Sequence, residues 1–399
     1  MSIRRLALAS VAIATVFLAT SSSLPGQSGG FGDPLPGLLP AEFERFRLGL
    51  EDFLEVETAE EGLGPAFNAA SCAVCHNVPA IGGVSLVSEV RAAYRDADGH
   101  IRPLTGSDGI ALDTLFHLFS TPTHGCQPKI PVEANIIIRR VPIPTFGAGL
   151  VEAIPDETLL SLADPDDRDG DGVSGRAAVV TDVATGRPRV GRFGWKSQHA
   201  TLRTFSADAY RNEMGITNEL FPQELAAGVS PAQMRLCDPT RDPEDVPDRR
   251  TRLAAIDNFE SFMKFLGPPP RGAITEGVQA GERVFGQIGC TACHVPILET
   301  GPSRLPLFDR RAVPLFSDLL LHDVGTGDGI PQGAALPHEI RTPALWGLRV
   351  RRPLLHNGTA STPLEAIERH RGEAESARQL FLKLDGAGRS QLLAFLDSL

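Results

Sequence analysis

Two five-residue stretches of this chain carry the same reactive pattern, Cys-x-x-Cys-His. They are Cys72-Ala-Val-Cys75-His76 and Cys290-Thr-Ala-Cys293-His294. In this pattern two thiols add across the vinyl groups of one porphyrin, and the adjacent histidine ligates the haem iron. The sequence therefore predicts two covalently attached c-type haems, with His76 and His294 as proximal iron ligands.

The same cysteine pairs admit two other interpretations. A Cys-x-x-Cys pair can act as a dithiol redox centre, and thiolates together with a histidine can hold zinc. Here each pair is followed directly by a histidine, and neither pair lies in the βαβ pattern of a dithiol oxidoreductase. Haem attachment is the favoured interpretation.

The start of the chain has the features of an export signal. Arg4 and Arg5 form a basic beginning. A 14-residue apolar run, Leu6–Ala19, follows, and small residues occupy Thr20–Ser23. The run is shorter than the roughly 20 residues that a membrane-spanning helix needs. We therefore expect a signal peptide over residues 1–23, export to the periplasm and no stable membrane insertion.

The overall composition bounds the class of protein. A length of 399 residues is enough for two or three compact domains, and 42% hydrophobic residues supply their cores. The 40 glycines and 32 prolines indicate a loop-rich protein. A net charge of −11 argues against nucleic acid as a partner, and it suits a basic small redox protein as electron donor.

Two cysteines, Cys126 and Cys237, lie outside the Cys-x-x-Cys-His motifs. In an oxidising compartment such a remaining pair predicts a disulfide. The alternative, two unrelated buried thiols, stays open from the sequence.

The pattern of apolar residues predicts several helices and one domain boundary. Helical spacing occurs over 42–54, 155–162 and 258–266, and again in two C-terminal helices at 362–370 and 377–399. Three consecutive prolines within 266–272 predict an extended linker. We expect a mainly α fold with long loops and little β structure, made of two cytochrome c-like haem domains. The N-terminal haem domain would span 24–266 and the C-terminal one 273–399.

An acidic loop follows the helix predicted at 155–162. Asp167, Asp169 and Asp171, with Gly172, occupy positions one, three, five and six of a calcium-binding loop. The twelfth position is Ala178, so the usual bidentate glutamate is missing. The loop is a candidate calcium site, and a solvated acidic turn is the alternative.

Longer segments resemble one family. Four C-terminal segments are similar to signatures of the bacterial di-haem cytochrome c peroxidase superfamily: Gly281–His294, Phe316–Gly325, Arg341–Leu345 and Pro353–Gly358. Five segments resemble its di-haem oxidoreductase branch, also called "predicted thiol oxidoreductase": Gly64–Cys72, Phe146–Leu150, Asp169–Gly175, Arg192–Lys196 and Arg341–Gly347. The resemblance covers nearly the whole chain after the export signal.

The resemblance implies a second iron ligand for the C-terminal haem. In the superfamily a methionine eight positions after the threonine of a C-terminal helix ligates that haem. Here the helix begins at Thr362, and the ligand position is His370. Bis-histidine iron normally has a lower potential than iron with a methionine ligand, because the thioether favours the ferrous state. A surface histidine is the alternative for His370.

The resemblance also implies an open, reactive N-terminal haem. Trp195 matches the tryptophan that bridges the haems, and Glu213 matches a distal carboxylate that acts as a general acid or base on peroxide. Phe205 stands where the peroxidases carry a glutamine. The alternatives are a core aromatic for Trp195 and an ordinary carboxylate for Glu213. Glu152 competes for the distal role, and Met214 could ligate iron but fits core packing better.

The remaining histidines have less specific roles. The resemblance implies that His322 and His356 brace the second haem pocket rather than ligate iron. His117, His124 and His199 have no assigned role.

The implied function is an exported di-haem c oxidoreductase that reduces hydrogen peroxide or a related oxidant at the N-terminal haem. Electrons would enter through the C-terminal haem from a cytochrome c or cupredoxin type of donor. The alternative is a di-haem electron-transfer cytochrome without catalysis.

Overall fold

The computed structural model describes residues 29–103, 114–121, 126–224, 226–227, 229–237 and 246–399. The predicted signal peptide and His124 lie outside the described residues. In the part of the chain that is described, no helix is both long enough and apolar enough to cross a membrane.

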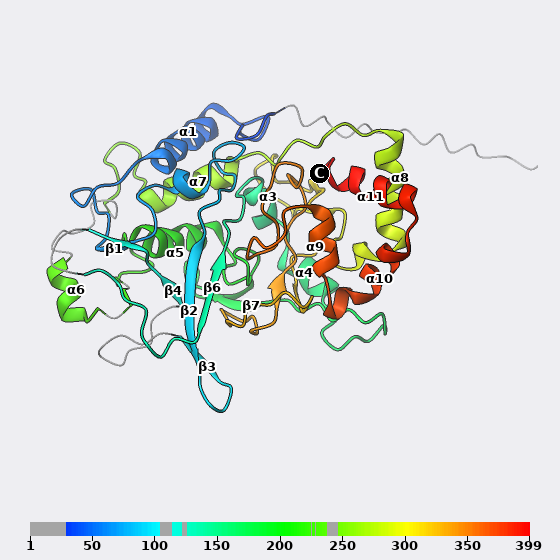
Figure 1. Ribbon diagram of the computed structural model, residues 1–399. Coiled ribbons are helices and arrows are strands. Elements are labelled where there is room, and N and C mark those ends of the chain that lie inside the picture. Colours follow the sequence, from blue (N-terminus) through cyan, green and yellow to red (C-terminus); the bar gives the residue numbers. More distant parts are fainter. Residues whose placement is uncertain (1–28, 104–113, 122–125, 225, 228, 238–245) are drawn as a thin grey trace, which may run out of the picture.

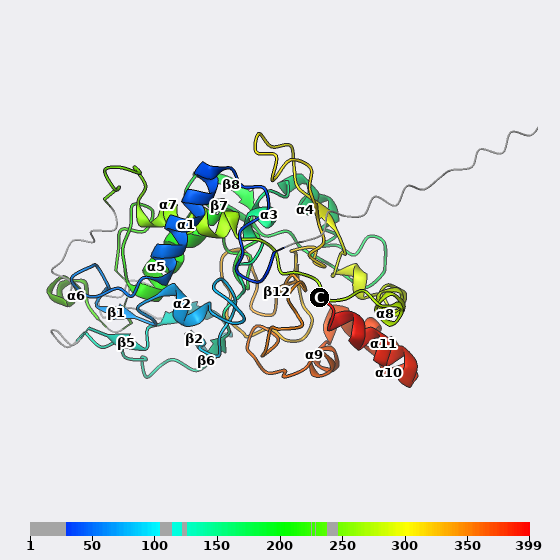
Figure 2. The same ribbon diagram turned by 90° about the horizontal axis from the view of Figure 1, so that it is seen from above.

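Three helices form the scaffold of the N-terminal half: α1 (Pro40–Leu54), α5 (Leu202–Met214) and α7 (Ala255–Phe265). Figures 1 and 2 show α1 lying beside α7, with α5 on the other side of α7. The contact between α1 and α7 depends on Gly49, because a Cβ there would lie 2.1 Å from the Asn258 carbonyl oxygen. Phe53 and Phe262 stack nearby, with ring centroids 4.6 Å apart.

A four-stranded antiparallel sheet lies beside this scaffold (Figure 1). Its central strand β2 (Glu89–Arg95) pairs with β3 (Ile101–Pro103), β4 (Leu115–Phe116) and β6 (Ile136–Arg140). In the β2–β6 register Glu89 stands opposite Arg140. Directly opposite residues have neighbouring side chains, so this pairing brings two charged groups together at one end of the sheet.

A second group of helices packs at the C-terminal end of the chain. It comprises α8 (Glu276–Gln287), α9 (Pro363–Arg369), α10 (Glu375–Lys383) and α11 (Gly386–Leu396). Helix α8 approaches α11 closely, since a Cβ on Gly281 would lie 1.9 Å from the Gln391 carbonyl oxygen. Phe285 and Phe395 face each other across this contact, with ring centroids 5.2 Å apart.

The remaining elements are short. The helices are α2 (Cys72–Cys75), α3 (Ala148–Glu152), α4 (Asp156–Leu162), α6 (Pro231–Cys237), η2 (Cys290–Ala292) and η3 (Gly372–Ala374). Two-stranded antiparallel pairs are β1 (Ala66–Phe67) with β5 (Phe119–Ser120), β7 (Val179–Asp182) with β8 (Arg187–Val190), β9 (Leu298–Glu299) with β10 (Ala312–Val313), and β11 (Leu321–His322) with β12 (Ile340–Arg341). The described chain is helix-rich and contains long loops.

The helices predicted at 42–54, 155–162, 258–266 and 362–370 are confirmed as α1, α4, α7 and α9. The single helix predicted over 377–399 is wrong, because the structure divides it into α10 and α11. Asp385 causes the division: its side chain accepts a hydrogen bond from the Gly388 backbone N–H at 2.8 Å and so begins a new helix.

The main hydrophobic core crosses the predicted domain boundary. Buried residues from both sides of the Pro268–Pro270 linker contribute to it, including Phe262 and Leu266 before the linker and Leu298, Leu315 and Trp346 after it. A second core holds the C-terminal helices together around Phe381 and Phe395. The division into domains at 24–266 and 273–399 stays a prediction.

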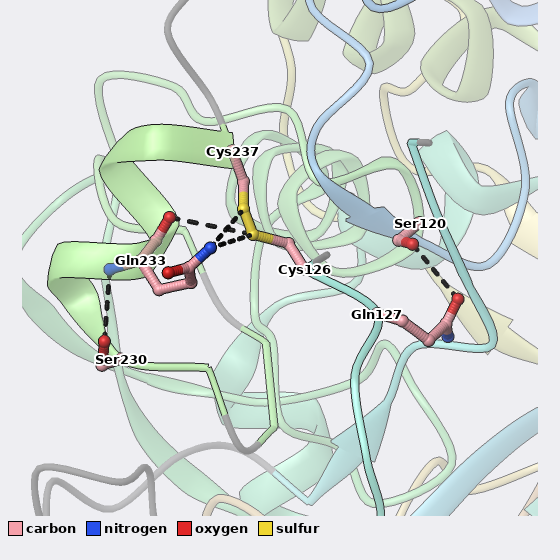
Figure 3. Close-up of a disulfide and its surroundings, with 6 residues drawn as sticks. All are labelled: Ser120, Cys126, Gln127, Ser230, Gln233 and Cys237. Carbon is pink, nitrogen blue, oxygen red and sulfur yellow. Dashed lines mark hydrogen bonds between the residues drawn. A yellow bond between two sulfur atoms is a disulfide. The ribbon is translucent and has the colours of Figure 1, made fainter. Parts of the chain in front are cut away.

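The predicted disulfide between Cys126 and Cys237 is confirmed (Figure 3). The two Cα atoms are 6.1 Å apart, and the bridge joins the end of α6 to the segment that follows β5. The Gln233 side chain lies against both sulfurs, with Nε2 3.7 Å from Cys126 Sγ and 3.8 Å from Cys237 Sγ.

Candidate active site

The first Cys-x-x-Cys-His motif forms the short helix α2 and the residue after it. Ser71 caps this helix, because its hydroxyl accepts a hydrogen bond from the Ala73 N–H at 3.3 Å. His76 Nδ1 lies 2.9 Å from the Gly83 carbonyl oxygen. Burial lowers the pKa of His76 below its usual value, so the ring is neutral. With Nδ1 held by the backbone, Nε2 is the nitrogen left for a metal.

A cavity of about 180 Å³ opens beside this motif. It is lined by both cysteines and His76, and by residues from the sheet, from α5 and from α7. Among the lining residues are four that the sequence analysis discussed: Trp195, Phe205, Glu213 and Met214. The fold therefore brings the predicted catalytic residues to the first motif. Met214 Sδ lies 4.0 Å from Cys72 Sγ.

Glu213 is a carboxyl group with specific partners at this cavity. Asn68 Nδ2 donates a hydrogen bond to Glu213 Oε2 at 3.0 Å. Glu89 lines the same cavity, close enough for its negative charge to act on the Glu213 carboxyl group. Burial raises the pKa of Glu213 to about 8, and the negative charge of Glu89 adds to this rise. At neutral pH Glu213 is therefore mostly protonated.

Glu89 is the ion-pair partner of Arg91, which binds it through two contacts. Arg91 Nε lies 2.7 Å from Glu89 Oε1, and Arg91 Nη2 lies 3.2 Å from Glu89 Oε2. Both residues line the first cavity. Sequence reasoning missed Glu89, since it lies in no motif; its place on a strand that pairs with Arg140 is a tertiary property.

Glu152, the competing candidate for the distal role, lies elsewhere. Its Oε1 accepts a hydrogen bond from the Leu202 N–H at 2.7 Å, at the beginning of α5. It is absent from the described lining of the first cavity. Its position therefore stabilises a helix end rather than supplying an acid to the cavity.

The second Cys-x-x-Cys-His motif begins in η2. His294 Nδ1 lies 3.0 Å from the Phe316 carbonyl oxygen. Burial lowers the pKa of His294 to about 4, so this ring is also neutral. The motif lines a cavity of about 410 Å³.

His370 lines the same cavity as His294. It directly follows α9, and its Nδ1 lies 2.7 Å from the Ala366 carbonyl oxygen. Burial lowers its pKa as well. All three histidines predicted as iron ligands thus direct Nδ1 to a backbone carbonyl and leave Nε2 for another partner. A hydrogen bond of this kind fixes the ring orientation of a ligating histidine.

The other histidines differ from this arrangement. His322 lies 2.8 Å from Asp318 Oδ2 through Nε2 and 2.8 Å from Glu373 Oε2 through Nδ1. Although burial favours the neutral ring, these carboxylates raise its pKa to about 12. His199 Nε2 contacts Asp208 Oδ2 at 2.9 Å, and His117 Nε2 lies 2.7 Å from the Asn212 carbonyl oxygen. The Nε2 atoms of these histidines are already engaged.

Trp195 lines both cavities. Its Nε1–H donates to the Val141 carbonyl oxygen at 2.8 Å. The ring of His356 lies edge-on to it, with centroids 6.1 Å apart, and His356 lines the second cavity. Phe205, at the position of the peroxidase glutamine, stacks on Phe193 at 5.6 Å.

The acidic loop brings its three predicted calcium ligands together. One carboxylate oxygen each of Asp167, Asp169 and Asp171 lies within 4.8 Å of the others. The loop is wrapped by hydrogen bonds of its own, such as Gly172 N–H to Asp167 Oδ1 at 3.1 Å. Asp171 also lines the second cavity.

Two Cys-x-x-Cys-His motifs, each at the wall of its own cavity, define the class of this chain as a di-haem redox protein. Residues 130–399 match the family described as "Di-haem oxidoreductase, putative peroxidase", and the chain belongs to this family. It is therefore an oxidoreductase with haem cofactors. The match includes the second motif, whereas the first lies before its beginning.

Three solved structures are similar to the chain at low identity. Hydrazine synthase of Kuenenia stuttgartiensis is 16% identical over 98% of this chain and 100% of that chain, with a TM-score of 0.42. The diheme peroxidase BthA of Burkholderia thailandensis is 15% identical over 89% and 86%, with a TM-score of 0.40. A MauG-like protein associated with microbial copper homeostasis is 17% identical over 70% and 95%, with a TM-score of 0.34. No functional conclusion depends on these similarities. No curated protein sequence matches the chain.

Proposed function

We propose that this protein is an exported di-haem c oxidoreductase that reduces hydrogen peroxide or a related oxidant at its first cavity. The main support for this proposal is that different groups of histidines line the two cavities. The second is lined by two histidines, His294 and His370, whose Nδ1 atoms are each held by a backbone carbonyl and whose Nε2 atoms are left for another partner. In the described lining of the first cavity His76 is the only histidine, and a protonated Glu213 accompanies it.

The donor groups of both cavities fit covalent haem. Cys72 and Cys75 would hold one haem with His76 as ligand, and Cys290 and Cys293 the other, with His294 and His370 as ligands. Burial raises the pKa of Cys72, Cys75 and Cys290 to about 12. Neutral thiols are poor nucleophiles, which disfavours a dithiol redox centre, and each pair is followed directly by the histidine that haem attachment requires.

Bound haem supplies the redox-active iron for reduction of the oxidant. Side chains of the protein supply the protons that the reaction consumes. Reduction of H₂O₂ to two molecules of water consumes two electrons and two protons. Glu213, protonated at neutral pH, donates one proton to the oxygen that leaves as water. Asn68 fixes its carboxyl group by the hydrogen bond to Oε2. Glu89 pairs with Arg91, and its negative charge raises the pKa of Glu213, which favours reprotonation of Glu213.

Trp195 is the proposed route for electrons between the cavities, because its ring lines both. The hydrogen bond from Nε1 to the Val141 carbonyl oxygen and the edge contact with His356 hold the ring in place. Electrons would enter at the second cavity from a small redox protein of the cytochrome c or cupredoxin type. The net charge of −11 suits a basic donor.

Met214 favours a second candidate function, a di-haem electron carrier without catalysis. Its thioether lines the first cavity and is buried. A thioether can ligate haem iron and close the site to substrate. Its contact with Cys72 Sγ at 4.0 Å places it beside an attachment cysteine, which fits packing against the cofactor edge equally well.

Spectroscopy of the haem-loaded protein separates these functions. The chain is expressed with c-type haem maturation machinery and examined by pyridine haemochrome and electron paramagnetic resonance. The proposal expects two covalent haems per chain, one low-spin and one high-spin, with the high-spin signal changing on addition of peroxide. Two low-spin signals that do not change on addition of peroxide would establish the alternative function, an electron carrier without catalysis. Absence of covalent haem would overturn both functions.

Export and calcium binding complete the proposal. Haem attachment takes place after export, which agrees with the predicted signal peptide at 1–23 and with the Cys126–Cys237 disulfide. The carboxylates of Asp167, Asp169 and Asp171 converge as calcium ligands do. The loop is linked to the second cavity, because the Ser174 N–H donates to Glu373 Oε2 at 2.9 Å and Glu373 contacts His322.

A further inference from the structure

A cluster of buried charges lies between the two cavities, centred on Asp328. Asp328 Oδ2 lies 2.7 Å from Arg140 Nε, and Oδ1 lies 3.4 Å from Lys196 Nζ. His356 Nε2 is 3.7 Å from Oδ2. The side chains of all four residues are at most 2% exposed. We call these residues the Asp328 cluster.

The Asp328 cluster carries an unbalanced positive charge. Arg140 and Lys196 contribute two cations and Asp328 one anion. Burial lowers the pKa of His356 to about 4, so it is neutral. Lys196 remains mainly protonated at neutral pH, since burial lowers its pKa only to about 8. Glu89, opposite Arg140 in the sheet, is a further anion that acts on Arg140. A buried guanidinium is stabilised further when each of its N–H groups meets an acceptor.

The cluster has free hydrogen-bonding atoms at both cavities. Lys196 is satisfied, because Nζ binds the carbonyl oxygens of Leu336, Pro337 and Glu339 at 3.1, 3.1 and 2.6 Å. Arg140 Nη1 donates to Gln332 Oε1 at 2.6 Å, but Nη2 is buried and has no hydrogen-bond partner. Neither ring nitrogen of His356 has a hydrogen-bond partner either. Arg140 lines the first cavity and His356 the second.

We propose that the Asp328 cluster is a carboxylate-binding site shared by the two cavities, with Arg140 donating to a haem propionate in the first and His356 to one in the second. A guanidinium with one free edge suits a carboxylate, and a neutral imidazole donates a single hydrogen bond to one. The inference rests on the proposed haem content of both cavities. The proposed site also links the two cavities electrostatically, because Asp328 contacts both Arg140 at the first cavity and His356 at the second.

The same chemistry would be offered by a small soluble carboxylate that enters the first cavity. The haem assignment is favoured because the free groups face two cavities at once, each with its own attachment motif. A soluble ligand would have to occupy both cavities to satisfy both groups. Addition of acetate to the wild type and to the Arg140 variants distinguishes a haem propionate from a soluble carboxylate.

The test uses the haem-loaded full chain, with resonance Raman spectra of the propionate modes and spectroelectrochemical titration as readouts. Variants are Arg140→Gln, Arg140→Lys and Asp328→Asn. Arg189→Gln is the matched control, since Arg189 Nε makes the same 2.7 Å contact with Asp156 Oδ2 but lines neither cavity. Covalent haem content and circular dichroism establish folding.

Arg140→Gln is expected to shift the propionate mode of the N-terminal haem and to lower its midpoint potential, because a nearby positive charge favours the reduced state. Arg140→Lys is expected to keep the wild-type midpoint potential of the N-terminal haem but not its wild-type propionate mode. Asp328→Asn is expected to raise both midpoint potentials, and Arg189→Gln to change neither haem.

The inference is overturned if folded Arg140→Gln protein keeps the wild-type propionate mode and potential. Should Arg140→Gln fail to fold, an unchanged mode in Arg140→Lys decides against it in the same way. A spectral response of the wild type to acetate that is lost in the Arg140 variants would assign the site to soluble carboxylates. Shifted potentials in a protein inert to peroxide would contradict only the peroxidase proposal.

Discussion

Glu213 and Glu89 line the wall of the same cavity, where the negative charge of Glu89 acts on the Glu213 carboxyl group. Burial is the larger cause, and together with the Glu89 charge it raises the pKa of Glu213 to about 8. Arg91 binds both oxygens of Glu89, and the Asn68 amide donates to Glu213. Glu213 is therefore an acid at the pH at which most carboxyl groups are ionised.

Glu213→Gln should lower the rate of peroxide reduction by about 10²–10⁴-fold, the usual contribution of a general acid. The amide keeps the size of the side chain but cannot supply the proton. Steady-state assays with a reduced small cytochrome c measure the change. Glu219→Gln is the control, because Glu219 is an exposed partner of Arg203 outside the cavity. Wild-type rates in Glu213→Gln would remove the acid assignment.

Glu89→Gln should move the pH dependence of peroxide reduction toward lower pH. In the wild type the acid form of Glu213 is lost as the pH rises through about 8. Removing the negative charge of Glu89 lowers the pKa of Glu213, so activity should disappear at lower pH than in the wild type. A pH–rate profile measures the shift. An unmoved alkaline limb would show that the charge of Glu89 does not raise the pKa of Glu213.

His370→Ala should convert the C-terminal haem from low-spin to high-spin, because its second iron ligand is lost. His370→Met should restore a low-spin centre with a higher midpoint potential, since a thioether favours ferrous iron. Electron paramagnetic resonance and potentiometric titration report these changes. His338→Ala is a control at an exposed histidine outside both cavities. A low-spin signal that persists in His370→Ala would exclude His370 as the ligand.

Trp195→Phe should slow electron transfer between the haems while leaving both haem spectra unchanged. The substitution removes the indole that lines both cavities and its hydrogen bond to Val141. Stopped-flow oxidation of the fully reduced protein by peroxide measures the rate. Trp346→Phe changes the only other tryptophan, a core residue that lines neither cavity. Equal rates in the two variants would contradict a bridging role for Trp195.

Calcium should raise the unfolding temperature of the wild type, because a ligand that binds only the folded state stabilises it. At a calcium concentration about 100 times the Kd the gain is about 2.7 kcal/mol. Asp167→Asn with Asp169→Asn should abolish the effect. Asp166→Asn should retain it, since Asp166 pairs with Arg168 and lies outside the cluster of three carboxylates. A calcium response unaffected by the double substitution would place the ion elsewhere, and no response in the wild type would exclude calcium binding.

Several features of this protein can be predicted from short stretches of its sequence. These features are the two Cys-x-x-Cys-His motifs, the helices α1, α4, α7 and α9, and the disulfide. The motifs and helices depend on residues close together in the sequence. The disulfide follows because two cysteines remain outside the motifs. His370 required a family resemblance, since a lone histidine at the end of a helix has no distinctive spacing. The break between α10 and α11 was not predicted, because it depends on a side-chain hydrogen bond from the Gly388 N–H to Asp385 that begins a new helix.

The sequence by itself determined which reactive groups the chain carries: four thiols and two histidines at the spacing typical of c-type haem attachment. Only the tertiary structure decided how the two sites differ. Glu89 meets Glu213 across 124 residues, and Arg140 meets Asp328 across 188. Such pairs form because strand register and helix packing bring distant backbone segments together and exclude water. The resulting loss of hydration raises the pKa of Glu213 and leaves Arg140 Nη2 buried without a hydrogen-bond partner.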